Sequence, residues 1–452
     1  MKKPNRPKSR NQAPPSSTAR ALPSEARTLT IEKPIYGGAF LARDEGKAVF
    51  VPITLPGEQA RVRMVEEKRG YATAEVEEIL VPAPERVTPG CRHFGPCGGC
   101  QYQHAAYETQ LNLKQAVLRE TLERSGVTSQ GDIAVISGRP WGYRNRIRLA
   151  FDATGNPGYR GRRSHAVIPI AECPIAAPLL VKAALAFAEV ARTFAPALRL
   201  AELALFCDRD ETALLASVFV ANAAQVRFGD FAKACQERIP ELKGAELIAE
   251  IPQKGRTAPS PPRTIAQWGD AAINYRAAGF DYRVDHGSFF QVNRWLVDPL
   301  VECVTANRNG VLAWDLFAGV GLFARKLTSA FERVIAVESA PAATQALAAN
   351  LKGTAGEAVH ASTLDFLRRN RSGKRPDLII VDPPRTGLGP DITAWLIESA
   401  TTAITYVSCD PATLARDLRA LLTAGYRMDS VTLTDLFPQT FHLETVVHLR
   451  QS

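Results

Sequence analysis

The sequence predicts an α/β protein with three folded regions: an N-terminal OB-like β-barrel, a central α+β region and a C-terminal doubly wound, Rossmann-like domain. Short β segments separated by Gly and Pro turns follow one another closely between residues 28 and 82, as in small barrels. Residues 128–285 mix strands and helices without regular alternation. From residue 311 apolar strands alternate with helices, which is typical of a parallel sheet covered on both faces.

The composition is that of a globular protein. Of 452 residues, 46% are hydrophobic and 22% are charged, which suffices for a sizeable core and excludes a mostly disordered or fibrous chain. Seven basic residues and one acidic residue in 1–27 account for +6 of the net charge of +9, so only +3 remains for the rest of the chain. We therefore expect a disordered basic tail over residues 1–27, and the net charge alone does not indicate nucleic-acid binding.

The sequence contains no recognisable targeting or membrane segment. No apolar run reaches the ~18 residues of a membrane span, and the N-terminus lacks the apolar stretch of a secretory signal. Prolines at positions 4, 7, 14 and 15 disfavour the amphipathic helix of an organellar transit peptide. We expect a cytoplasmic monomer without membrane contact.

Turn residues and composition suggest limits for the three regions. We expect the barrel at residues 28–86, the central region at 87–285 and the C-terminal domain at 286–452. Early in the central region, the pattern of residues 105–125 predicts one amphipathic helix ended by Gly126. That helix is a candidate to pack on the C-terminal domain.

A ligand crevice is predicted where the first strand of the C-terminal domain ends. Residues 315–321 (DLFAGVG) end that strand and open a helix, and their glycines allow a ligand to approach the backbone. Glu338 ends the next strand, where a carboxylate accepts hydrogen bonds from ribose hydroxyls. Ala324 stands where a dinucleotide fingerprint has its last glycine. From these residues alone, a nicotinamide enzyme and an S-adenosylmethionine methyltransferase are both open, and so is a tight strand–helix turn that binds no ligand.

Two further strand ends and one loop carry candidate catalytic groups. Asp382 precedes two prolines that stop a strand, so its side chain projects from the tip. Cys409 lies between a strand and a helix that begins near Pro411, and a helix N-terminus favours the nucleophilic thiolate. Alternatively, Cys409 is a small buried apolar residue. Glu444 precedes the last strand and is either a general base or an ordinary surface carboxylate.

Four cysteines form a candidate metal site. Cys91, Cys97 and Cys100 lie within ten residues, and Cys173 follows 73 residues later. In a reducing compartment, such clustering favours metal ligation over disulfides. By spacing, a [4Fe–4S] cluster and a structural zinc ion are both open, and His93 or His104 could replace one ligand.

Five motifs, in this order, resemble those of the bacterial RNA 5-methyluridine methyltransferases. The resemblance is to the type with an N-terminal TRAM domain and an iron–sulfur cluster that modifies 23S ribosomal RNA, and it covers nearly the whole chain after the tail. The motifs are residues 289–293 (FFQVN), 315–321 (DLFAGVG), 382–387 (DPPRTG), 406–411 (YVSCDP) and 442–444 (HLE).

The resemblance implies a covalent mechanism on RNA. Cys409 would attack C6 of a target uracil, which makes C5 nucleophilic toward the methyl group of S-adenosylmethionine. Glu444 would then remove the C5 proton, and Cys409 would leave by elimination. Asp382 would hydrogen-bond the uracil edge, and the target base would have to leave its stack.

The resemblance also implies which residues bind the cofactor. Leu322 stands where relatives often have Asn, so any contact there would be through the backbone. At the third strand, the position near the adenine corresponds to Ser362, with Asp365 close by, and either of the two would contact the adenine. The implied S-adenosylmethionine-binding residues are Gln291, Phe317, Leu322, Glu338, Ser362 and Asp382.

The resemblance favours a [4Fe–4S] cluster on Cys91, Cys97, Cys100 and Cys173, with a structural or RNA-positioning role. It implies an RNA partner, with 23S ribosomal RNA favoured and transfer RNA as the alternative. The barrel would bind RNA as a TRAM domain. The Arg- and aromatic-rich stretches 141–148 and 159–163 suit stacking and backbone contact with single-stranded RNA, although a solvated basic face is the competing interpretation.

Three other functions compete with this one. A radical methylthiotransferase would need C-x3-C-x2-C, but the spacing here is C-x5-C-x2-C with a fourth cysteine. An amino-methyltransferase also uses Asp-Pro-Pro but needs no Cys–Glu pair. A non-catalytic RNA-binding or assembly protein would not need Cys409, Asp382 and Glu444 together.

Overall fold

The molecule is described from a computed structural model of the chain. It describes residues 26–128, 131–194, 198–220, 227–249, 263–306, 308–371 and 373–451. All but the last two residues of the expected basic tail lie outside these ranges. The described residues divide into two compact units, one formed by residues 26–33 with Phe40–Pro82, and the other by Pro34–Ala39 with the described residues from Ala83 onward. The domain limits expected at residues 86 and 285 stay predictions.

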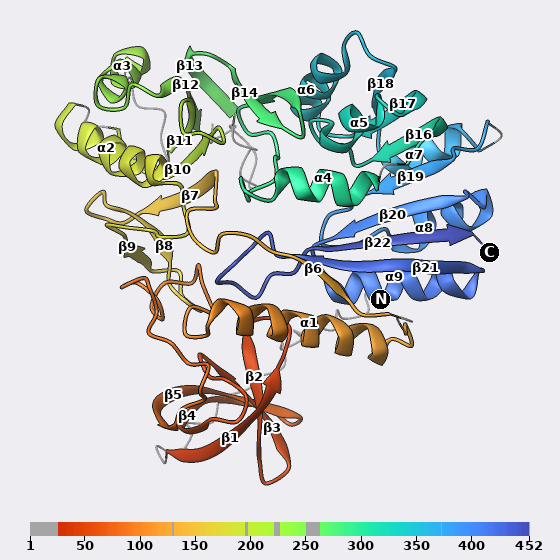
Figure 1. The fold of residues 1–452 in the computed structure, drawn as a ribbon. Coiled ribbons are helices and arrows are strands. Elements are labelled where there is room, and N and C mark those ends of the chain that lie inside the picture. Colours follow the sequence, from red (N-terminus) through yellow and green to blue (C-terminus); the bar gives the residue numbers. More distant parts are fainter. Residues whose placement is uncertain are drawn as a thin grey trace, which may run out of the picture. The chain divides into compact units, whose positions relative to one another are not determined.

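The smaller unit is a closed five-stranded barrel with strand order β1-β2-β3-β5-β4. Burial alternates along β4, with Ala60, Val62 and Met64 inside and their neighbours exposed, because successive side chains of a strand point to opposite faces. The strands, red to orange in Figure 1, are β1 (Arg27–Pro34), β2 (Ala39–Asp44), β3 (Lys47–Pro52), β4 (Gln59–Glu67) and β5 (Tyr71–Val81).

The central part of the larger unit is a seven-stranded sheet with the order β13-β12-β11-β10-β7-β8-β9. Helices α2 (Pro178–Phe194) and α3 (Phe228–Arg238) bury Phe187 and Phe231 in its core, where the two ring centroids lie 5.9 Å apart. The strands are β7 (Arg146–Phe151), β8 (Pro157–Arg160), β9 (Val167–Pro169), β10 (Leu200–Cys207), β11 (Leu214–Val220), β12 (Leu242–Ala249) and β13 (Arg263–Gly269).

An eight-stranded sheet with the order β18-β17-β16-β19-β20-β22-β21-β6 forms the rest of this unit. Strands β16 to β20 are mutually parallel, and β22 is antiparallel to its neighbours β20 and β21. The predicted doubly wound, Rossmann-like class is therefore confirmed. The strands are β6 (Ala134–Ile136), β16 (Gly310–Leu316), β17 (Phe331–Glu338), β18 (Gly356–His360), β19 (Leu378–Val381), β20 (Ala403–Ser408), β21 (Tyr426–Thr434) and β22 (Thr445–Gln451).

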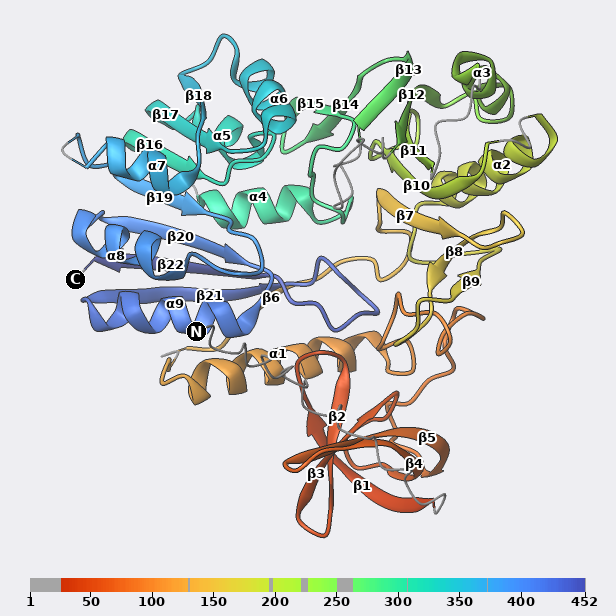
Figure 2. The same cartoon turned by 180° about the vertical axis from the view of Figure 1, so that it is seen from behind.

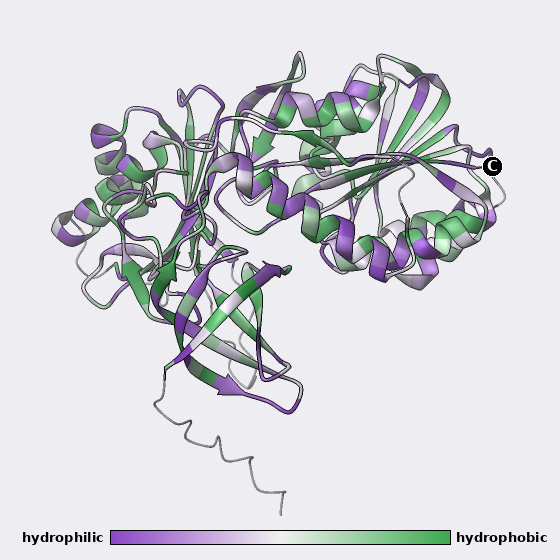
Figure 3. Ribbon diagram, turned by 60° about the horizontal axis from the view of Figure 1, so that its bottom comes forward, coloured by the Kyte–Doolittle hydropathy of each residue, from purple (hydrophilic) through white to green (hydrophobic). Residues whose placement is uncertain are grey.

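Two apolar layers cover the faces of this sheet. Along β19, Leu378 and Ile380 face one layer, whereas Ile379 and Val381 face the other. Figure 3 shows the strands of the eight-stranded sheet as largely hydrophobic. Among the described helices, none is both long and apolar enough to cross a membrane. The first layer contains α4 (Val297–Thr305), α5 (Leu322–Leu327) and α6 (Pro341–Leu351); the second contains α1 (Tyr107–Arg124), α7 (Thr363–Arg369), α8 (Gly389–Ser399) and α9 (Pro411–Thr423).

Helix α1 and strand β6 precede the central sheet in sequence, yet they belong to the Rossmann-like sheet and its second layer. Strand β6 pairs in parallel with β21, and α1 packs beside α9, as Figures 1 and 2 show. The helix predicted over 105–125 is α1, which ends shortly before Gly126. Gly126 has a φ of +75°. A left-handed glycine is a common helix terminator because it lacks a Cβ.

A short hairpin leads from the central sheet into the Rossmann-like part. It consists of β14 (Ala272–Ala277) and β15 (Phe280–Asp285), which pair in antiparallel register. Tyr275 and Tyr282 lie opposite each other on its buried face. Both pack in the apolar cluster that also contains α4 and α5, so the hairpin anchors the residues 289–293 that follow it.

Candidate active site

The candidate catalytic and cofactor groups come from neighbouring strand ends. Strand β16 lies between β17 and β19, so the chain runs to one side of β16 and then crosses to the other. In doubly wound sheets, ligands bind outside the carboxyl ends of the strands at such a switch point. Asp315 and Glu338 lie at the ends of β16 and β17, while Asp382 and Cys409 follow β19 and β20.

The turn after β16 has the open, strained backbone expected of a ligand cradle. Phe317 has a φ of +67°, which is costly for a residue with a side chain. Gly319 also has a positive φ, and a Cβ added there would meet no atom within 4 Å. Its N–H donates to Glu338 Oε2 at 2.9 Å, and the Ala340 N–H donates to Oε1 at 2.6 Å. Glu338 is therefore fixed beside the turn.

Asp315 is a buried carboxyl beneath this turn. Its Oδ2 accepts a hydrogen bond from the Ala324 N–H at 2.8 Å, while Oδ1 has no partner among the described residues. Burial raises the pKa of Asp315 to about 8, with smaller contributions from the charges of Asp382 and Glu338. Buried polar atoms usually have a hydrogen-bond partner. A ligand with a hydrogen-bond donor, bound at the open turn, would supply one for Asp315 Oδ1.

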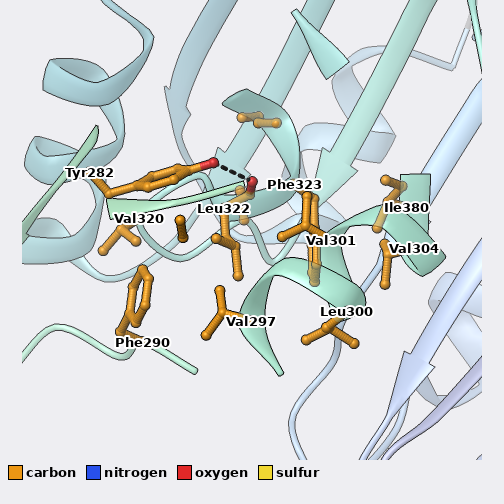
Figure 4. Packing of buried hydrophobic residues seen from close by; sticks show 14 of the residues in the cluster. Tyr282, Phe290, Val297, Leu300, Val301, Val304, Val320, Leu322, Phe323 and Ile380 are labelled. Atoms are coloured by element: carbon orange, nitrogen blue, oxygen red, sulfur yellow. Dashed lines mark hydrogen bonds between the residues drawn. The ribbon is translucent and has the colours of Figure 1, made fainter. Parts of the chain in front are cut away.

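The other predicted cofactor residues occupy different surroundings. Gln291 is buried, and its carbonyl oxygen accepts from Asn145 Nδ2 at 2.9 Å. Leu322 opens α5 with its side chain in the apolar cluster, and its carbonyl oxygen accepts from the Tyr282 hydroxyl at 3.0 Å (Figure 4). The Ser362 hydroxyl caps α7 by accepting from the Asp365 N–H at 3.1 Å. Cofactor contacts of these three residues remain predictions.

Cys409 sits where β20 ends and α9 begins. The Asp410 carboxylate caps α9 by accepting from the Ala412 and Thr413 N–H groups, each at 3.0 Å. The expectation that the helix N-terminus favours the Cys409 thiolate stays a prediction, and other groups around the thiol also act on its pKa. Burial raises the pKa of the Cys409 thiol to about 11, and the charges of Glu444 and Asp382 add to this, while Arg385 opposes it.

Glu444 and Asp382 form an acidic pair beside this thiol. Glu444 is buried, and burial together with the charge of Asp382 raises its pKa well above the ordinary value. Burial also raises the pKa of the partly buried Asp382 to about 7. Glu444 is thus no ordinary surface carboxylate. The structure brings together Cys409, Asp382 and Glu444, which lie far apart in the sequence.

Three neighbours of this site carry no role in the sequence-based prediction. Arg385 Nη2 lies 3.0 Å from His442 Nδ1, and both belong to motifs that the sequence singled out. The Tyr36 hydroxyl donates to the Cys409 carbonyl oxygen at 3.3 Å, and its ring meets Phe441 edge-on at 5.6 Å. No local sequence pattern marks Tyr36, because the contact is made across 373 residues of chain.

The four cysteines Cys91, Cys97, Cys100 and Cys173 line one cavity, together with His93. Burial raises the pKa values of Cys91 and Cys97 and brings that of Cys100 to about 12, with a further contribution from the charge of Cys173. Thiols with raised pKa values are protonated when no cation is near. A bound cation favours the thiolate, which is the form that acts as a ligand. Among the described residues, no three His, Cys, Asp or Glu side chains converge closely enough to hold a single metal ion.

Two family models match the chain. Residues 22–76 match the TRAM domain, and residues 374–452 match the tRNA (Uracil-5-)-methyltransferase family. The first match covers most of the five-stranded barrel, and the second includes Asp382, Cys409 and Glu444. The fold and the groups at its strand ends therefore define an RNA methyltransferase.

Similar proteins extend the match to nearly the whole chain. A Chromohalobacter salexigens protein named 23S rRNA (uracil(1939)-C(5))-methyltransferase RlmD is 34% identical, covering 96% of this chain and 91% of its own. A Thermotoga maritima protein named uncharacterized RNA methyltransferase is 31% identical, covering 93% and 98%. The crystal structure of Pyrococcus abyssi tRNA (uracil-54, C5)-methyltransferase with S-adenosyl-L-homocysteine matches with a TM-score of 0.74 and 25% identity, covering 93% and 99%. The chain belongs to the RNA (uracil-5-)-methyltransferase family, enzymes that use S-adenosylmethionine.

Proposed function

We propose that Cys409 is the nucleophile and Glu444 the base in the methylation of uracil C5. The observation that carries this proposal is the convergence of Cys409, Asp382 and Glu444 from three chain segments, close enough for the two carboxylates to raise the pKa of the thiol. A non-catalytic RNA-binding protein has no need for a thiol and two carboxyls of raised pKa at one strand edge. The same grouping favours C5 chemistry over amino-methyl transfer.

The turn after β16 supports S-adenosylmethionine binding by this chain. Phe317 and Gly319 offer an open backbone, Glu338 stands at the position for ribose hydroxyls, and Asp315 has an oxygen without a partner among the described residues. We assign cofactor contacts to Gln291, Phe317, Leu322, Glu338, Ser362 and Asp382. When bound, S-adenosylmethionine supplies the electrophilic methyl group.

The residues then act in sequence on an extruded uracil. Asp382, protonated in part because its pKa is near 7, hydrogen-bonds the uracil edge. The Cys409 thiol loses its proton to solvent, and its sulfur forms a bond to C6 while the C5–C6 double bond opens and its electron pair moves to C5. C5 would then take the methyl group as the methyl–sulfonium bond breaks and the cofactor leaves as a neutral thioether. Glu444 removes the remaining C5 proton, and the Cys409–C6 bond breaks to restore the double bond.

We propose 23S ribosomal RNA as the substrate. The curated relatives named for a position in 23S rRNA match over nearly the full chain at 31–34% identity. The matching solved structure is named for transfer RNA, so transfer RNA is the alternative. A hollow lined by Arg148, Arg160, Arg162 and Arg163 supports contact with an RNA backbone.

We also infer that the enzyme acts as a monomer in the cytoplasm. Sedimentation with and without RNA tests the monomeric state.

Methyl transfer from labelled S-adenosylmethionine tests the function directly. Wild-type protein and Cys409→Ala are incubated separately with unmodified 23S rRNA and transfer RNA, and the labelled nucleoside is identified after digestion. We expect 5-methyluridine in 23S rRNA with the wild type alone. Label only in transfer RNA would overturn the substrate, and label retained by Cys409→Ala would overturn the nucleophile. Cys235→Ala, which alters a buried cysteine far from the strand ends in sequence, is the matched control.

We also propose that Cys91, Cys97, Cys100 and Cys173 hold a [4Fe–4S] cluster. The four thiols line one cavity, and four cysteine thiolates are the ligand set of such a cluster, with one structural zinc ion as the alternative. Iron, sulfide and zinc are measured after anaerobic purification of wild type, Cys173→Ser and Cys235→Ser. We expect four irons per chain in the wild type and Cys235→Ser, and iron loss in Cys173→Ser. One zinc per chain without sulfide would contradict the cluster.

A further inference from the structure

The loop that joins β21 to β22 ends at Glu444, and we name residues 435–444 the base loop. The Thr434 N–H donates to the Glu444 carbonyl oxygen at 2.8 Å, so the two ends of the loop are tied together. Asp435, Gln439 and Thr440 are almost fully buried, although connecting loops usually lie at the surface. A buried loop must find protein partners for its polar groups.

Helix α1 supplies several of these partners at one end of the base loop. Lys114 Nζ donates to Asp435 Oδ1 at 2.5 Å and to the Phe437 carbonyl oxygen at 2.9 Å. The Tyr107 hydroxyl donates to Asp435 Oδ2 at 2.9 Å. The side chains of Lys114 and Asp435 are only 1% and 0% exposed. A buried ion pair of this kind is stable only with close geometry and additional hydrogen bonds, and both are present.

A reciprocal glutamine pair joins α1 to the middle of the base loop. Gln110 Nε2 donates to Gln439 Oε1 at 2.9 Å, and the Gln439 N–H donates to Gln110 Oε1 at 2.9 Å. Gln439 has a φ of +69°, a left-handed conformation that costs energy for a residue with a Cβ. Its carbonyl oxygen also accepts from the N–H groups of Gln101 and Tyr102, each at 3.0 Å.

Two further groups fix the same loop from other segments. The Tyr143 hydroxyl donates to the Pro438 carbonyl oxygen at 2.9 Å, and Asn293 Nδ2 donates to the Leu436 carbonyl oxygen at 3.2 Å. In Figure 1 the loop, dark blue, extends from the sheet toward the N-terminal end of α1. The base loop is therefore held by hydrogen bonds from helix α1, from the segment after Cys100 and from residues 289–293.

We propose that Gln110 and Lys114 are positioning residues that hold Glu444 where it takes the C5 proton, acting through the base loop. This inference rests on the proposed role of Glu444 as the base. Attack by Cys409 and methyl transfer precede the step that needs Glu444. A loosened base loop therefore slows the final elimination and leaves RNA covalently attached to Cys409.

The test separates the last step from the earlier ones. Gln110→Met keeps the side-chain length but removes both hydrogen bonds to Gln439. Gln115→Met is the matched control, because Gln115 lies on the same helix and donates instead to the Ile133 carbonyl oxygen at 2.9 Å. Trapping by 5-fluorouridine RNA stops before elimination, since fluorine replaces the C5 proton. Release of methylated RNA in a single turnover on ordinary RNA requires the elimination.

We expect Gln110→Met to be trapped at the wild-type rate but to release methylated RNA ~10–100-fold more slowly, the size of effect of a displacement of about 1 Å. A denaturant-resistant protein–RNA complex should accumulate on ordinary RNA. Gln115→Met should match the wild type in all three measurements.

Equal losses in trapping and release would overturn the proposal and show a general structural role for Gln110. An unchanged release rate would overturn it as well. If Gln110→Met does not fold, Gln439→Gly removes the side-chain acceptor of Gln110 Nε2 while keeping the backbone N–H and accepting the left-handed backbone. A selective loss of release in the same direction is expected. Failure of the underlying function is distinguishable, because the wild type itself would then form no trapped complex.

Discussion

The guanidinium of Arg385 donates from Nη2 to Nδ1 of His442 across 3.0 Å. Burial lowers the pKa of His442 to about 4, and the positive charge of Arg385 adds to the effect. A neutral imidazole is the form that accepts this hydrogen bond, so the two side chains are compatible at neutral pH. The positive charge of Arg385 also lowers the pKa of Cys409, whereas burial and the charges of Glu444 and Asp382 raise it.

Arg385→Ala should therefore raise the pKa of Cys409 by up to about one unit, because a nearby cation is removed. The rate of Cys409 alkylation by iodoacetamide, followed on its tryptic peptide by mass spectrometry across pH, measures this pKa. Trapping by 5-fluorouridine RNA should slow in parallel. Arg333→Ala, which alters an exposed arginine paired with Glu357, is the control. An unchanged alkylation profile in Arg385→Ala would contradict the assigned electrostatic role.

Glu444→Gln should slow release of methylated RNA while permitting its covalent attachment. The amide cannot accept the C5 proton, so we expect release to slow by ~10²–10⁴-fold. In the wild type the base must be deprotonated, and its pKa is raised by burial and by Asp382. Single-turnover release should consequently increase with pH, by up to about tenfold per unit below that pKa. A release rate independent of pH would argue against Glu444 as the base.

Asp315→Asn should change how stability depends on pH. The folded protein keeps the Asp315 proton up to about pH 8, whereas the unfolded chain loses it near the ordinary value of 3.8. Between these values the folded state binds one more proton, so the contribution to the free energy of unfolding falls as pH rises, by at most about 1.4 kcal/mol per unit.

Urea unfolding at pH values from about 5 to about 8, which lie between the ordinary pKa of 3.8 and the raised pKa of about 8, measures this dependence. The slope should be shallower in Asp315→Asn than in the wild type. Asp391→Asn alters an exposed aspartate and should leave the slope unchanged. Parallel curves for wild type and Asp315→Asn would show that the buried carboxyl does not hold its proton.

Tyr282→Phe should destabilise the start of α5. The fully buried hydroxyl donates to the Leu322 carbonyl oxygen at 3.0 Å (Figure 4), and its loss leaves a buried acceptor without a partner. We expect the free energy of unfolding to fall by ~1–3 kcal/mol, measured by urea titration. Tyr71→Phe, at a partly exposed barrel position, should change it by less than about 0.5 kcal/mol. Equal effects would mean that the hydrogen bond adds little.

The fold class was predictable because the signal is local. Apolar runs such as 378–381 and 404–407 are buried on both faces, so they read as parallel strands without any tertiary information. The regular helix of residues 107–124 was equally visible from its periodicity. By contrast, nothing in residues 134–136 marks them as an edge strand of a sheet formed mainly after residue 310, because that pairing is decided by distant residues.

The candidate site was predictable to the extent that it lies at strand ends. Asp382 and Cys409 follow recognisable strands, and their convergence follows from parallel topology. The raised pKa of Cys409 was not predictable, because it depends on burial and on carboxylates brought in by tertiary structure. The contact of Tyr36 with Cys409 and the network around Gln439 depend on side chains hundreds of residues apart.

Strand β6 closes one edge of the Rossmann-like sheet by pairing with β21. A C-terminal fragment that begins at residue 286 would lack both β6 and helix α1. The backbone hydrogen-bonding groups along the outer edge of β21 would then lose their partners, and the apolar face of α9 would be exposed. Open sheet edges recruit other chains, so such a fragment should aggregate. A separately expressed catalytic module must therefore begin before Tyr107, and domain exchange between relatives must transfer residues 107–136 together with the C-terminal part.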